Sequence, residues 1–264
     1  MKNLLLILSI SLIIAACSSS NDPVQEMPPT ELNSLKIWVN SDMSSLNAKL
    51  KRYADSIKVN PTDTTNIRKA MQQLFGQLEF GFDVTFVSPE NIITMVEPPE
   101  YSAVINKDLS DDENLLLMLQ RKDLTFGSLF PANEGIWGAM VACPIYQDDQ
   151  FLGALSVLID LNEYLKDLIA DLKLKEGLHI SVFEKSGTVL VGRKNEELGK
   201  NIFFDEYYDD YPDFRSVCEK AAQSISGDSE YEYTNEQGQK KIREVYWNTI
   251  SLYGIQWKIL SEQD

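Results

Sequence analysis

The chain has 264 residues, with 24 Lys and Arg against 40 Asp and Glu, for a formal net charge of −16. A surface of this sign repels nucleic acid and anionic lipid headgroups, so we expect no nucleic-acid partner. The length after the N-terminal segments suits either one large domain or two domains of about 100 residues.

Residues 1–16 have the pattern of a secretory signal peptide. Lys2 precedes a short apolar run, and small residues lead up to Cys17. The segment Ile14-Ala15-Ala16-Cys17 resembles the lipobox of bacterial lipoproteins, which implies that Cys17 becomes the lipidated first residue and attaches the protein to a membrane. The alternative is an anchor without lipid. We expect a location in the bacterial cell envelope, on the outer membrane or the periplasmic face.

Residues 17–29 are small, polar and proline-containing, which predicts an extended tether. From Thr30 to Ile57 apolar residues recur at steps of three and four, so we expect one helix of about 28 residues and about 40 Å. This helix could pack on its own sheet, lie along two stacked domains, or pair with a copy of itself. A second, shorter helix follows Pro61 and ends the N-terminal helical region at residue 78.

Residues 79–172 predict a first unit of mixed helix and sheet. In chain order we expect strands at 82–87 and 92–96, a helix through 113–119, a strand at 124–130, a hairpin of strands 136–146 and 151–160, and a helix at 161–172.

Residues 173–264 repeat this order without obvious sequence identity. The expected elements are strands at 178–183 and 188–192, helical stretches at 196–204 and 214–225, and strands at 230–234, 240–250 and 255–260. Two α+β units of similar topology are the economical interpretation.

The order of elements and three segments resemble the double Cache sensor modules of bacterial extracytoplasmic receptors. The segments are the long helix at 30–57, GALSVLIDLNEYL at 153–165, and HISVFEKSGTVLVGRKNEELGKNIF at 179–203. The resemblance implies an α+β fold in which two PAS-like antiparallel-sheet domains are stacked along the N-terminal helix. Residues 79–172 would be the distal domain, which usually holds the ligand, and residues 173–264 the proximal domain.

The same resemblance places a ligand pocket between the distal sheet and its covering helix and loops. Asp160 matches the position where an acidic residue of amino-acid-binding members meets the ligand amine, although it could instead cap the following helix. The arginine and Trp-Tyr that accompany that residue in the family are missing. Apolar walls with a few polar groups suit a small-molecule pocket, and the expected wall consists of Tyr101, Arg121, Phe126, Trp137, Tyr146 and Asp160. Trp137 and Tyr146 could equally be core residues.

Catalytic and metal chemistry find little support in the sequence. His179 is the only histidine, and P-loop and dinucleotide motifs are missing. Cys143 and Cys218 are expected to be buried free thiols. The acidic loop at 205–213 lacks the residue order of a calcium loop, although its tyrosines could contact a ligand. We therefore expect no catalytic residue, metal or cofactor.

These patterns together predict a membrane-anchored extracytoplasmic sensor lipoprotein. It would bind a small polar ligand reversibly and pass the change to a separate membrane signalling protein. The alternative is a non-catalytic surface lipoprotein with a structural or adhesive role.

Overall fold

The computed structural model describes residues 29–132, 134–235 and 237–263. The predicted signal peptide, the lipidation site Cys17 and the tether up to residue 28 lie outside the described residues. Within the described ranges, no helix combines the length and the apolar character needed to cross a membrane.

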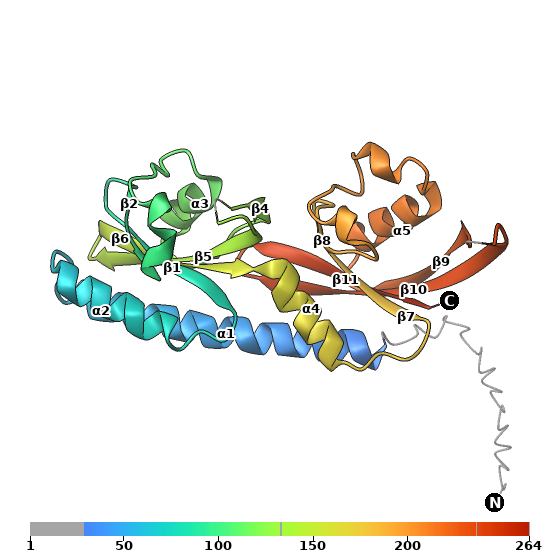
Figure 1. Ribbon diagram of the computed structural model, residues 1–264, viewed down its shortest axis with the longest axis horizontal. Coiled ribbons are helices and arrows are strands. Elements are labelled where there is room, and N and C mark those ends of the chain that lie inside the picture. The colour runs from blue at the N-terminus through green and yellow to red at the C-terminus, as the bar shows by residue number, and fades with distance from the viewer. Residues whose placement is uncertain (1–28, 133, 236, 264) are drawn as a thin grey trace, which may run out of the picture.

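Two antiparallel sheets follow one another along the long axis of the molecule (Figure 1). In spatial order the first sheet contains β2 (Ile93–Glu97), β1 (Gly81–Val87), β6 (Gln150–Asp160), β5 (Trp137–Gln147) and β3 (Thr125–Phe126), with β4 (Phe130–Pro131) also paired to β5. The second sheet contains β8 (Val189–Val191), β7 (Leu178–Glu184), β11 (Ile255–Gln263), β10 (Lys240–Leu252) and β9 (Gly227–Thr234). This architecture confirms the predicted fold class.

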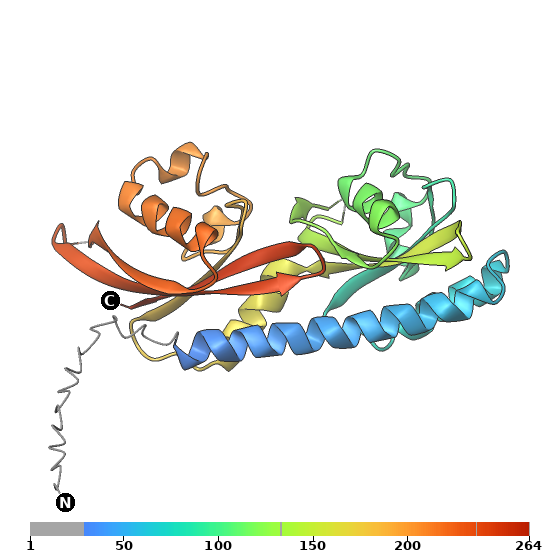
Figure 2. The same cartoon turned by 180° about the vertical axis from the view of Figure 1, so that it is seen from behind.

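One long helix, α1 (Thr30–Lys58), packs along both sheets, on β5 and β6 of the first and on β10 and β11 of the second (Figures 1 and 2). All eight apolar residues of the predicted stripe are buried: Leu32, Leu35, Val39, Met43, Leu46, Leu50, Tyr53 and Ile57. The helix α2 (Thr64–Phe75) packs beside α1 under the first sheet, and the Asp63 side chain caps its N-terminus. Of the three arrangements considered for the long helix, the structure shows the one that spans two units.

The opposite face of each sheet is covered by a separate set of helices. The short helix η1 (Pro99–Val104) and α3 (Glu113–Arg121) cover the first sheet, whereas η2 (Asn195–Glu197), η3 (Glu206–Tyr208) and α5 (Pro212–Gln223) cover the second (Figure 1). We call each sheet with these covering elements the first unit and the second unit. The helix α4 (Leu161–Asp171) connects the two. The domain boundaries given above stay a prediction.

A single hydrophobic core joins the two units through α1. Phe126 of β3 meets Trp257 of β11 edge to face, with ring centroids 5.4 Å apart, and both side chains are fully buried. The Asn162 side chain in α4 donates a hydrogen bond of 2.7 Å to the Leu190 carbonyl in β8. The units therefore share packed side chains in addition to a common helix.

Two predicted elements are wrong. The strand expected at 124–130 is two short pieces, β3 and β4, separated by residues 127–129, which are not part of a strand. The helix expected at 196–204 is only the single turn η2, because Gly199 adopts a left-handed φ of +78° that a right-handed helix cannot contain. The buried free thiols of Cys143 and Cys218 are confirmed.

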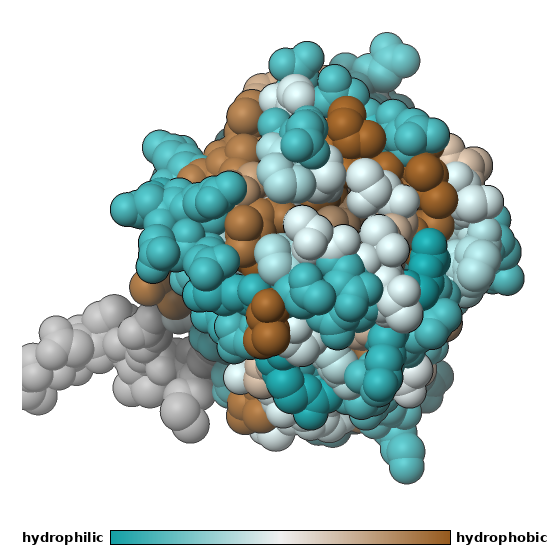
Figure 3. All heavy atoms as spheres, turned by 90° about the vertical axis from the view of Figure 1, so that its left-hand side faces the viewer, coloured by the Kyte–Doolittle hydropathy of each residue, from teal (hydrophilic) through white to brown (hydrophobic). Residues whose placement is uncertain are grey.

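The surface at the first-unit end of the molecule is uneven in polarity (Figure 3). Hydrophobic side chains are more frequent on the side of β2 and α3 than on the side of α1 and α2 (Figures 1 and 3). The α3-covered face is also where the first unit is hollowed by a cavity.

Candidate ligand-binding cavity

A cavity of about 650 Å³ lies between the first sheet and its covering elements. The strands β1, β5 and β6 form its floor, α3 and the loop before it form one side, and the loop at 127–129 forms another. Ile255 of the second unit also lines it. A volume in the range of about 300–1,000 Å³ suits one small molecule.

Strand alternation decides which side chains face this cavity. In β1, Asp83, Thr85 and Val87 line it, while the intervening Val84 and Phe86 join the core around α1. Because successive residues of a strand point to opposite faces, a single strand serves both the shared core and the cavity.

Asp83 is the most unusual group in the floor. Its side chain is 1% exposed, and its Oδ1 atom has no hydrogen-bond partner among the described residues. Burial, and secondarily the negative charge of Glu134, raises the pKa of Asp83 to about 7, although a backbone hydrogen bond from Leu158 opposes the shift. A buried carboxylate with an unused acceptor atom is poised to receive a cationic donor.

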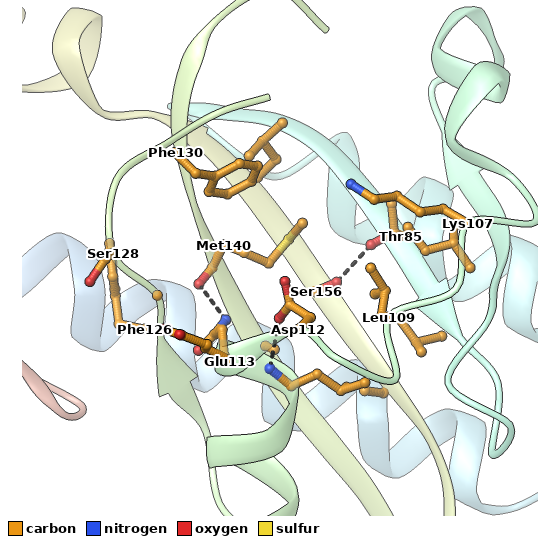
Figure 4. A pocket seen from close by; sticks show the side chains of 18 of the residues that line it. Thr85, Lys107, Leu109, Asp112, Glu113, Phe126, Ser128, Phe130, Met140 and Ser156 are labelled. Atoms are coloured by element: carbon orange, nitrogen blue, oxygen red, sulfur yellow. Dashed lines mark hydrogen bonds between the residues drawn. The ribbon is translucent and has the colours of Figure 1, made fainter. Parts of the chain in front are cut away.

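A second unused acceptor lies in the same cavity. The Asn114 side chain in α3 donates from Nδ2 to the Met140 carbonyl at 3.2 Å, and its Oδ1 atom is buried without a partner in the described part of the chain. In contrast, the hydroxyls of Thr85 and Ser156 are 2.6 Å apart and hydrogen-bond to each other (Figure 4). Both buried side-chain atoms of the cavity that have no partner among the described residues, Asp83 Oδ1 and Asn114 Oδ1, are therefore hydrogen-bond acceptors.

The charges around the cavity are mainly negative. Five carboxylates line it, from Asp83, Asp111, Asp112, Glu113 and Glu134, and Lys107 is the one cation among the described lining residues. The Lys107 side chain extends from its loop toward the Phe130 ring (Figure 4). One carboxylate is already engaged, because Asp112 accepts a hydrogen bond from the Leu115 backbone N–H at the start of α3.

The loop at 127–129 connects the cavity wall to the second unit. The backbone N–H of Leu129 donates to Glu184 Oε1 at 2.8 Å, and the other carboxylate oxygen accepts from the Ser186 hydroxyl at 3.2 Å. Glu184 is 5% exposed at the end of β7, and burial raises its pKa. One buried carboxylate of the second sheet therefore holds the backbone of this loop by a hydrogen bond.

Of the six residues predicted from the sequence to bind ligand, Phe126 lines this cavity. Tyr101 does not line the cavity and packs against Phe82, with ring centroids 4.8 Å apart. Trp137 lies against Gly199 of the second unit, and Arg121 donates to the Tyr253 carbonyl there at 3.1 Å.

The remaining two lie elsewhere. Tyr146 contacts Phe151 and the Lys122 ammonium near the hairpin turn. Asp160 accepts a hydrogen bond of 3.1 Å from the Glu163 backbone N–H and so caps α4, which was the alternative considered for it. The structure does not bring the six together in one cavity, and their role in binding stays a prediction.

Sequence reasoning missed Asp83, Asn114 and Lys107. The sequence did indicate Asp83, because this carboxylate interrupts the apolar strand GFDVTFV. A charged side chain is rarely buried in a strand unless it has a binding partner. Asn114 and Lys107 carry no comparable signal, since polar residues in capped helix starts and loops are common.

Comparison with known proteins agrees with this architecture. Solved structures with the same fold include an extracellular ligand-binding receptor from Desulfohalobium retbaense, at 19% identity and a TM-score of 0.73. The match covers 89% of this chain but only 39% of the receptor chain. Methyl-accepting chemotaxis protein X matches with 15% identity, a TM-score of 0.70, and coverage of 88% and 94%.

A third structure is the ligand-binding domain of the Pseudomonas aeruginosa amino acid chemoreceptor PctB in complex with L-Arg, at 15% identity, a TM-score of 0.61, and coverage of 88% and 89%. No curated protein matches the chain. The sequence model described as Cache domain matches residues 30–264. The chain therefore belongs to the Cache domain family.

Proposed function

We propose that the protein is an extracytoplasmic sensor module that binds a small molecule carrying a protonated amine in the cavity of the first unit. The observation that carries this proposal is the buried Asp83 carboxylate, one oxygen of which has no partner among the described residues, in a cavity of negative charge. The amine would donate to Asp83 Oδ1 and Asn114 Oδ1, and apolar residues such as Phe126 and Met140 would hold its hydrocarbon part.

Two further facts support this function. The chain belongs to the Cache family, and structures of similar fold include PctB with L-Arg and the Pseudomonas fluorescens chemoreceptor CtaA with L-isoleucine. Both of those ligands contain a protonated amine. Binding would shift an equilibrium between conformations, which the shared helix α1 and the contact between Leu129 and Glu184 would convey to the second unit.

Attachment to a membrane through lipid on Cys17, and signalling to a separate membrane protein, complete the proposal. The support is the lipobox-like segment at residues 14–17. Labelling of cells with an alkyne fatty acid should modify the wild-type chain, whereas the Cys17→Ser variant should remain unlabelled and be released from the membrane fraction. Labelling that persists in Cys17→Ser would contradict the lipid anchor.

The binding experiment compares matched probes of opposite charge. Calorimetric titration with phenethylamine should show saturable binding near pH 8, while hydrocinnamate, a carboxylate of similar shape, should not bind. Asp83→Asn should weaken amine binding at least about tenfold, because a charge-assisted hydrogen bond is lost. Lys107→Gln is the matched control, since removal of the lining cation should leave the affinity unchanged or increase it.

The pH dependence gives an independent readout. Because the pKa of Asp83 is about 7, the empty cavity protonates this carboxylate as the pH falls below 7, and amine affinity should fall about tenfold per pH unit there. Asp83→Asn should remove that slope. Equal affinity of wild type and Asp83→Asn at every pH, or preference for the carboxylate probe, would contradict the proposal.

A further inference from the structure

A second cavity of about 360 Å³ lies in the second unit, between its sheet and the segment that runs from η2 to the start of α5. Its floor is formed by side chains from β7, β9, β10 and β11. It shares none of its lining residues with the cavity of the first unit.

The two cavities occupy equivalent places in the two sheets. The strand order β2-β1-β6-β5-β3 corresponds to β8-β7-β11-β10-β9, and the covering helices α3 and α5 lie on the same side of the molecule (Figure 1). The first hairpin of each unit has an irregularity at the same point, between Phe86 and Val87 and between Val182 and Phe183.

That irregularity aligns the two floors residue by residue. Val87 corresponds to Phe183, so Thr85 corresponds to Ser181 two residues earlier. Across the central pair of strands, Thr85 faces Ser156 and Asp83 faces Leu158, whereas Ser181 faces Leu260 and His179 faces Glu262. Glu262 therefore takes the place of Leu158. The buried carboxylate of the second cavity lies on β11, which corresponds to β6, whereas that of the first cavity, Asp83, lies on β1.

The walls of the second cavity are aromatic. Six rings follow one another with centroids 5.0 to 6.4 Å apart, in the order Tyr211, Tyr207, Tyr208, Phe214, Tyr231 and Tyr233. Tyr211 at the rim is 46% exposed, whereas Tyr208 is 2% exposed. The Tyr208 hydroxyl is buried without a hydrogen-bond partner in the described residues, although a buried phenol normally finds one.

The charges deep in this cavity balance one another. Glu262 is fully buried and accepts hydrogen bonds from Ser181 Oγ at 2.9 Å, Tyr231 Oη at 2.8 Å and Arg193 Nε at 3.0 Å. Arg243 lies 3.9 Å from the same carboxylate and stacks on the Tyr233 ring, 3.8 Å from its centroid. With Glu197, the inner wall holds two guanidinium groups and two carboxylates.

We propose that this second cavity binds a flat, uncharged heteroaromatic molecule. Its ring would stack on the tyrosine rings, and its polar edge would meet the Tyr208 hydroxyl and the guanidinium of Arg193, whose side chain is 31% exposed. A balanced inner wall supplies no net charge to hold an ion. The other charged lining residues, Lys194, Asp210, Asp213 and Glu232, are exposed to water, which screens their attraction for an ion.

The probes that test this site are nicotinamide and adenine, with benzoate and choline as a flat anion and a compact cation. Calorimetric titration of the intact protein at pH 8 should show one nicotinamide or adenine bound per chain. Binding should also change tyrosine fluorescence, because the rings of the wall contact the probe. The Asp83→Asn variant distinguishes this site from the amine site of the first unit, because it should weaken amine binding and leave heteroaromatic binding intact.

Three variants locate the probe. Tyr211→Ala should weaken binding about tenfold through lost stacking. Tyr208→Phe keeps the ring and removes only the unpartnered hydroxyl, so it should preserve the thermal stability of the empty protein while it weakens binding. Phe204→Ala is the matched control, since Phe204 is 85% exposed in the same segment and does not line the cavity.

Saturable binding of nicotinamide or adenine that falls in Tyr211→Ala and Tyr208→Phe, but not in Phe204→Ala, supports the second site. Binding of benzoate or choline in preference to the neutral rings overturns the ligand class. The site itself is overturned if no probe binds, or if binding is lost in Asp83→Asn and unaffected by the two tyrosine variants.

Discussion

The Leu129 backbone N–H donates to Glu184 Oε1 across 2.8 Å, from the wall of the first cavity to the last residue of β7 in the second unit. Both residues are buried, at 9% and 5% exposure. This contact makes the first cavity dependent on the second sheet for the position of its wall.

Substitution of Glu184 tests that dependence. Glu184→Ala should lower the free energy of unfolding by about 1–3 kcal/mol, because the buried Leu129 N–H loses its acceptor. Glu184→Gln keeps a carbonyl oxygen at the same place and should be less destabilising. Urea unfolding at constant m-value measures the difference, and equal losses in the two variants would show that the hydrogen bond is not the cause.

Asp83 should make stability depend on pH. Its folded-state pKa of about 7 lies above the ordinary value of 3.8, so between these values the folded protein holds a proton that the unfolded chain has released. The contribution of Asp83 to stability therefore falls as pH rises from about 4 to about 7, by up to about 4 kcal/mol. Asp83→Asn carries no ionisable group, so its stability relative to wild type should increase from pH 5 to about pH 7 and then level off towards pH 8.

Thermal or urea unfolding of both proteins over that pH range measures the margin. Asp111→Asn is the control, because it removes an exposed carboxylate from the mouth of the same cavity. A margin between Asp83→Asn and wild type that does not change with pH would contradict the raised pKa.

Substitutions of Asp160 distinguish its role as the cap of α4 from the ligand-binding role predicted from the sequence. Asp160→Ala should cost about 1 kcal/mol of stability, because the Glu163 N–H loses the side chain that caps α4. Asp160→Asn should cost less, since asparagine is also a good cap. Phenethylamine affinity should be unchanged in both variants, because Asp160 does not line the first cavity. Loss of affinity in Asp160→Asn would support the ligand-binding role inferred from sequence.

Gly199 tests the contact between the units. A Cβ atom at Gly199 would lie 2.5 Å from the Trp137 ring, and the residue also has a φ of +78°. Gly238 has a similar φ of +75° but open space around its Cβ position. Gly199→Ala should therefore be more destabilising than Gly238→Ala by about 1–3 kcal/mol, the usual cost of overpacking. Thermal unfolding measures both, and equal effects would indicate that Trp137 moves aside freely.

The sequence by itself determined the elements that depend on local periodicity. The stripe from Leu32 to Ile57, the long hairpin of β5 and β6, and the repeated order of strands and helices follow from which residues must be buried at steps of two or of three and four. Residues 196–204 were misjudged because Gly199 has a left-handed φ and its N–H donates to the Val189 carbonyl in β8 at 3.0 Å, a pairing that helical periodicity does not reveal.

Only the tertiary structure decided which polar residues share a cavity. Asp83, Asn114 and Lys107 come from a strand, a helix and a loop, and Glu184 of the other unit accepts a hydrogen bond from Leu129 in the cavity wall. Their proximity depends on strand register and on helix packing between segments far apart in sequence. Local periodicity carries no information about either. Asp160 shows the converse: its place at the end of a strand was evident from sequence, but the fold directs its side chain to a helix N-terminus.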